Sequence, residues 1–98
     1  MIHVQIIGKD GAKLQSLVRS AIEKGSIKSF GIKQVRGGFI IEHAKHNGTV
    51  EFNQNRHILL STIKCKNNSK EWQLLETFVG RLTYHFREKI ASINIQFE

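Results

Sequence analysis

Two arginines flank a tyrosine near the end of the chain, at a spacing that could form a binding site. Arg81, Tyr84 and Arg87 lie three residues apart, in a segment whose apolar residues recur at helical intervals. Residues three apart on a helix are neighbours, so two guanidinium groups would stand on either side of one phenol ring. Such a group can hold phosphates while the ring stacks on a base or packs against a partner. The alternative is a solvated helix face on which Glu76 and Glu88 balance the arginines.

Other candidate cations gather near the ends of predicted strands. Lys64 and Lys66 lie at one strand end, and Lys28, Lys33 and Arg36 share one segment. The chain has 15 Lys and Arg against 8 Asp and Glu, a net charge of +7 with neutral histidines. A surface with this excess attracts polyanions and steers them at long range. The partner that we expect is therefore nucleic acid or an acidic protein.

Three histidines, His43, His46 and His57, are candidates for a metal or catalytic site, because imidazole is a common zinc ligand and a common general base. On one strand, His43 and His46 would point to opposite faces of the sheet. No second cysteine joins Cys65 to complete a site, so we expect neither a metal nor a cofactor. Hydrolytic catalysis by Glu42, His43 or His57 has no support beyond residue type, so we expect a binding protein in preference to an enzyme.

The elements that must position these side chains follow from hydrophobic spacing. Alternating apolar residues predict strands, and apolar residues three and four apart predict helices. Asp10 is expected to cap the first helix, whose end is marked by Gly25. The expected elements of the first half are a strand over 2–7, a helix with its apolar stripe over 14–22, a strand over 27–35, a turn at Gly37-Gly38 and a strand over 39–46.

The Asn47-Gly48 pair is a hairpin signal, because both residues of a type I′ turn must tolerate positive φ. A two-residue turn there predicts the cross-strand pairs His46 with Thr49, Lys45 with Val50 and His43 with Phe52. In this register Val50 and Phe52 share a sheet face with Phe39 and Ile41.

The second half repeats the order of strand, helix and strand. Residues 53–56 form a polar break, and a strand over 57–66 follows it. Either Asn68 or Ser69 can cap the second helix. Its expected core stripe is Trp72, Leu75, Phe78, Val79, Leu82 and Phe86. The last strand places Ile93, Ile95 and Phe97 on one face and polar residues on the other.

These elements predict an α+β fold with the order β-α-β-β-β-β-α-β. Two helices can cover only one face of the sheet, so we expect a two-layer sandwich with a mostly antiparallel sheet, a ferredoxin-like arrangement with an extra hairpin strand. Its 98 residues form one domain, 1–98. A lone cysteine, no signal-peptide pattern and no membrane-length apolar run favour the cytoplasm.

Three function classes remain open from the sequence. The first is a small basic, non-enzymatic module for nucleic acid or a ribonucleoprotein, acting through Arg81, Tyr84, Arg87 and the basic strand ends. The second is a self-associating interaction or regulatory domain, a possible homodimer, in which strands beside the polar break serve as edges for another chain. The third is a small enzyme or ligand-binding protein.

Overall fold

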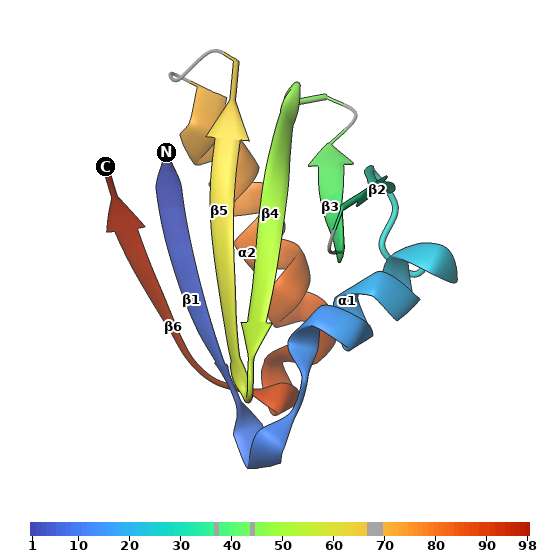
Figure 1. Ribbon diagram of the computed structural model, residues 1–98, viewed down its shortest axis with the longest axis vertical. Coiled ribbons are helices and arrows are strands. Elements are labelled where there is room, and N and C mark those ends of the chain that lie inside the picture. The colour runs from blue at the N-terminus through green and yellow to red at the C-terminus, as the bar shows by residue number, and fades with distance from the viewer. Residues whose placement is uncertain (37, 44, 67–69) are drawn as a thin grey trace.

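The computed structural model describes residues 1–36, 38–43, 45–66 and 70–98. It is an α+β structure with a six-stranded sheet and two α-helices (Figure 1). The elements follow one another along the chain in the expected order. Their bounds are β1 Ile2–Gly8, η1 Lys9–Gly11, α1 Leu14–Glu23, β2 Phe30–Val35, β3 Gly38–His43, β4 Gly48–Asn55, β5 Ile58–Cys65, α2 Glu71–Phe86, η3 Arg87–Lys89 and β6 Ile90–Phe97.

The strand order across the sheet is β2-β3-β4-β5-β1-β6, and all neighbours are antiparallel. This confirms an antiparallel α+β architecture. The ferredoxin-like order is not confirmed, because the arrangement differs from it: β2 to β5 run as a four-strand meander, and β1 is inserted between β5 and the last strand. The free edges of the sheet are therefore β2 and β6.

One apolar core lies between the sheet and the helices. α1 packs against β2 and β4, while α2 packs against β5 and β1. Residues alternate along β1, where Ile2, Val4 and Ile6 point into the core and the residues between them are half-buried on the other face. The other fully buried side chains include Leu14, Val18, Ile41, Val50, Leu59, Ile63, Leu74, Phe78 and Leu82.

The start of α1 differs from the expectation that Asp10 caps it. Asp10 has a φ of 53° inside the short η1 turn, too early in the chain to reach the helix. The backbone N–H of Gln15, in the first turn of α1, instead donates a hydrogen bond of 3.0 Å to Gln54 Oε1 on β4. At the other end, Gly25 has a φ of 79° and its N–H bonds to the carbonyl of Ile22. Glycine tolerates this left-handed conformation, which ends the helix as the sequence predicts.

The connection between β3 and β4 is longer than the predicted two-residue turn. His43 pairs with Gly48 and Ile41 pairs with Val50, so the predicted pairs of His43 with Phe52 and Lys45 with Val50 are wrong. The register differs by four residues, an even number, so the same side chains still face the core. Gly48 is needed for space and not for positive φ: an added Cβ would lie 2.7 Å from the Lys64 carbonyl oxygen and 2.8 Å from Leu74 Cδ2.

The predicted polar break at 53–56 is also wrong. Residues 53–55 belong to β4 and pair with β5, with Asn55 opposite Ile58. The chain reverses at Arg56, which has a φ of 57°. Backbone pairing to β5 holds these polar side chains in a strand, so this segment offers no free edge toward β5.

The core stripe of α2 is rotated from the predicted one. Leu75, Phe78 and Leu82 are buried as expected, but Trp72 is 52% exposed, and Leu74 and Glu71 are buried in its place. The Glu71 carboxylate lies 3.1 Å from the N-terminal ammonium group, and this ion pair compensates its burial. The Gly37 turn and the Asn68 or Ser69 cap lie outside the described residues. In the described part of the chain, neither helix has the length and apolarity that a membrane crossing requires.

Candidate anion-binding site at the turn between β3 and β4

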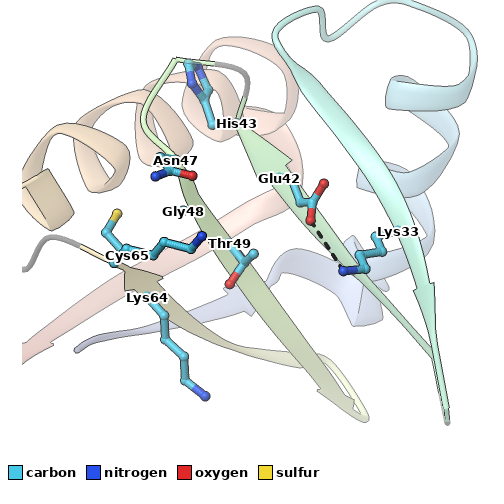
Figure 2. A pocket seen from close by; sticks show the side chains of 9 residues that line it. Lys33, Glu42, His43, Asn47, Gly48, Thr49, Lys64 and Cys65 are labelled. Carbon is cyan, nitrogen blue, oxygen red and sulfur yellow. Dashed lines mark ion pairs between the residues drawn. The ribbon is translucent and has the colours of Figure 1, made fainter.

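A hollow of about 570 Å³ lies at neighbouring ends of β3, β4 and β5, and Lys33 of β2 also lines it (Figure 2). Thr49 on β4 pairs with Glu42 on β3 and with Lys64 on β5, which sets these three side chains in one row across the sheet. The hollow is lined by Lys33, Glu42, His43, Asn47, Gly48, Thr49, Lys64, Cys65 and Lys66. The structure thus brings together three of the predicted cations, Lys33, Lys64 and Lys66.

Carboxylates accompany two of these three lysines. Lys33 Nζ lies 3.9 Å from Glu42 Oε1, a pair that Figure 2 shows, and Lys64 Nζ lies 2.8 Å from Glu51 Oε2. The outer face of the sheet therefore carries alternating charges here. Exposed pairs of this kind contribute little stability, but they reduce the positive potential that a bound anion would meet.

A second hollow, of about 380 Å³, lies beside the first at the β3–β4 turn. Asn47 and Lys66 line both hollows, so the two are neighbours. We call the second one the basic hollow: its lining residues are Lys45, His46, Asn47, Lys66, Lys70 and Gln73. Among the described residues that line it there is no Asp or Glu. Three lysines thus line one concavity, and none of its described lining residues carries a carboxylate.

The histidine pair fixes the turn that carries Lys45. His43 is buried on β3, and its Nδ1 accepts a hydrogen bond of 3.0 Å from the Lys45 backbone N–H. The ring of His46 stacks on that of His43 at 4.3 Å, and the His46 Nε2 lies 3.4 Å from Thr77 Oγ1 on α2. The expectation that the two histidines point to opposite faces is wrong, because His46 lies in the turn and not on the strand.

The environment of His43 favours the neutral imidazole. Its pKa is lowered mainly by burial, and the positive charges of His46, Lys45 and Arg81 lower it further. An Nδ1 that accepts a hydrogen bond must be unprotonated, which agrees with this direction. Within the described residues, no group of three or more His, Cys, Asp or Glu side chains is arranged to hold a metal ion. The hydrogen bond with the Lys45 N–H ties His43 to the turn.

Cys65 lies beside the hollow on the inner row of the sheet, opposite Gly48. Burial raises the pKa of its thiol, and the nearby Glu71 carboxylate raises it further. Both effects favour the protonated thiol, so the side chain behaves as a small apolar group and not as a nucleophile.

The other predicted cations lie elsewhere. Arg81 and Tyr84 are exposed on α2, and Arg87 is exposed in η3, where the helix has ended. Tyr84 and Arg87 border a hollow at the C-terminal end of α2, whereas Arg81 borders a different, apolar cavity between the two helices. Lys28 precedes β2 and Arg36 follows it, and neither lines the two hollows at the turn.

Sequence reasoning missed Lys45, His46 and Lys70 as site residues. The hairpin prediction extended the strand to His46, which paired Lys45 across the sheet and concealed that both residues lie in a turn. Lys70 immediately precedes α2, and the pairing of Gly48 with Cys65 brings the turn beside it. The signal available in the sequence was the Lys45-His46 pair next to Asn47-Gly48, a run of turn-compatible polar residues. Comparisons of the chain with protein-family models, with curated proteins and with solved structures find no match.

Proposed function

We propose that this protein is a non-enzymatic module that binds the phosphate backbone of nucleic acid at the basic hollow. The observation that carries the proposal is the convergence of Lys45, Lys66 and Lys70 on one concavity that no described carboxylate lines. Lysine ammonium groups are point charges that bind phosphate oxygens from any direction. The net charge of +7 adds long-range attraction for a polyanion.

The chemistry of the hollow favours backbone contacts over base reading. Among its described lining residues there is one aromatic ring, His46, and that ring is already stacked on His43. Without a free ring to stack on bases, affinity comes from phosphate contacts, which carry no sequence information. We therefore expect weak sequence preference and a strong dependence on salt.

The test measures binding of fluorescently labelled oligonucleotides, single-stranded RNA, single-stranded DNA and duplex DNA, by anisotropy across a salt series. The logarithm of the binding constant should fall linearly with the logarithm of salt concentration, because each neutralised phosphate releases counterions. No detectable binding to any of the three at about 50 mM salt would remove the proposal. Binding of an acidic polypeptide alone would assign the surface to a protein partner instead.

The double variant Lys66→Gln with Lys70→Gln locates the site. Loss of two phosphate contacts should reduce the salt slope by about 1.4 on single strands and by about 1.8 on duplex. Its matched control is Lys9→Gln with Lys24→Gln, which removes the same charge from exposed positions outside both hollows. Equal losses from the two double variants would mean that only net charge matters.

The surface of α2 is the competing location within the same function. Arg81→Ala with Arg87→Ala should leave the salt slope nearly unchanged if the basic hollow holds the phosphates. If this pair flattens the slope and the lysine pair does not, the nucleic acid binds at α2. Tyr84 is 79% exposed. In that case Tyr84→Ala should weaken binding by about 1 to 3 kcal/mol, because the stacking of its ring on a base is lost.

A further inference from the structure

The β6 edge of the sheet presents backbone groups that β1 does not pair. The Glu98 N–H donates to the Met1 carbonyl oxygen at 3.1 Å, and β6 pairs with β1 in a regular antiparallel register from Phe97 to Ser92, before a bulge at Gly8. Hydrogen-bonded positions alternate along such a ladder. Since residue 98 bonds toward β1, the N–H and C=O groups of Ile93, Ile95 and Phe97 point away from β1, toward the free edge.

The C-terminal part of the apolar face of β6 is left uncovered: Ile93 packs against the core, but Ile95 and Phe97 do not. Ile95 pairs with the buried Val4 and Phe97 pairs with the buried Ile2, so all four lie on the core side of the sheet. Ile95 is nevertheless 36% exposed and Phe97 70% exposed, contrary to the core position that the sequence predicts. α2 lies over β5 and β1, and Figure 1 shows β6 at the far edge of the sheet beyond it.

Trp72 belongs to this same exposed surface. Gln73 and Thr77 lie on the flank of α2 that faces the β3–β4 turn, since Gln73 lines the basic hollow and Thr77 contacts His46. At 100° per residue, Trp72 and Val79 occupy the opposite flank, which faces β1 and β6. The adjacent Glu71 contacts the N-terminus, which places Trp72 at the same end of the sheet as Phe97. The rings of Trp72 and Phe97 leave on the order of 250 Å² of apolar surface in water.

The charged side chains on the two edge strands, β2 and β6, indicate what can cover this surface. β6, with the sequence Ile-Ala-Ser-Ile-Asn-Ile-Gln-Phe, has no charged side chain from Ile90 to Phe97. β2 carries Lys33 and is flanked by Lys28 and Arg36. Charged side chains on an edge strand oppose pairing with another chain, and in a protein of net charge +7 two copies repel wherever basic surfaces meet. A second copy of this chain can pair with β6 over Ile90–Phe97 without placing charged strand side chains opposite each other.

We propose that two copies of this protein form a dimer by antiparallel pairing of β6 with β6. A two-fold axis perpendicular to the sheet makes the contact self-complementary and keeps the core faces of both sheets on one side. The outward N–H and C=O groups of Ile93, Ile95 and Phe97 then bond to the same strand of the second copy. The exposed rings of Trp72 and Phe97 are buried along the seam, and the six strands of each copy continue as one sheet.

Mass in solution tests the dimer. Light scattering and sedimentation from about 1 μM to about 1 mM should show the mass rising from 11.2 kDa toward double that value. Trp72 is the only tryptophan, so its emission should shift to shorter wavelength over the same concentrations as the ring leaves water. A strict monomer up to about 1 mM would overturn the proposal.

Phe97→Lys places a charge on the seam and should keep the protein monomeric, with Trp72 emission that no longer changes with concentration. Its control is Val35→Lys on β2, the other edge, where the native apolar side chain is 40% exposed. This control should dimerise like the parent; if it abolishes dimerisation and Phe97→Lys does not, the edge is wrong. Circular dichroism checks the fold of both variants. If Phe97→Lys unfolds, Phe97→Ser removes the ring without a charge and should weaken the dimer at least tenfold.

Discussion

The protonation state of His43 affects the geometry of the basic hollow. The pKa of His43 is lowered in the folded protein from its ordinary value of about 6.5. As the pH falls, this side chain therefore takes up its proton earlier in the unfolded chain than in the folded protein. The free energy of unfolding should therefore fall as the pH drops below about 6.5, and level off below the folded pKa. Protonation also removes the acceptor for the Lys45 N–H, so the turn that presents Lys45 loosens in the same range.

Urea unfolding at a series of pH values from about 7.5 to about 5 measures this loss. His43→Asn keeps a side-chain acceptor without a titratable group, and it should flatten the pH dependence. The matched control is His57→Asn, in the exposed turn between β4 and β5, which should retain the dependence of the parent. If the two variants respond to pH alike, the buried imidazole is not the source.

Gly48 is the second residue whose role is decided by its neighbours. Gly48→Ala would press a methyl group against the Lys64 carbonyl oxygen and the Leu74 side chain, so we expect a loss of about 1 to 3 kcal/mol in the free energy of unfolding. Gly31→Ala is the control, since an added Cβ at Gly31 meets no described atom within 4 Å. Thermal or urea unfolding compares the two. A Gly48→Ala protein as stable as the Gly31→Ala protein would contradict the close approach of β4, β5 and α2.

At the scale of elements, α1 depends on a side chain from a distant strand. Gln54 on β4 supplies the acceptor for the Gln15 N–H, a hydrogen bond that joins residues 39 positions apart. Gln54→Ala should therefore cost about 0.5 to 2 kcal/mol of stability and fray the first turn of α1. The control is Asn53→Ala, its neighbour on the same strand. Hydrogen exchange at Gln15 and the two unfolding free energies measure the effect, and equal values for the two variants would refute this cap.

At the scale of the whole molecule, the two proposed surfaces lie on opposite flanks of α2. Lys70 and Gln73 face the basic hollow, while Trp72 lies on the flank toward β6. The two surfaces share no residue, so we expect them to work independently. The monomeric Phe97→Lys protein should bind oligonucleotide with a salt slope per copy close to that of the parent. Loss of binding in a folded Phe97→Lys protein would show that nucleic-acid binding requires the dimer.

The element order and the identity of the core face follow from local patterning. Alternation over residues 2–7 recurs in the other strands, so errors in turn length left the inward faces of the strands correct, whereas the core stripe of α2 was predicted with a rotation. The hairpin illustrates why: a register error of four residues preserves side-chain direction, because the period of a strand is two. The excess of positive charge is equally a property of composition, and it sets the class of partner that we propose.

The sequence by itself determined the α+β order, most of the core and the positive charge; the tertiary structure decided which lysines meet and which edges stay free. Lys45, Lys66 and Lys70 converge only because Gly48 pairs with Cys65, a contact set by close packing that no local propensity contains. Trp72 and Phe97 have the residue types and spacing of core positions, yet they remain exposed because α2 packs over β5 and β1. Local spacing fixes the direction of a side chain, but what covers it depends on contacts between segments far apart in the chain.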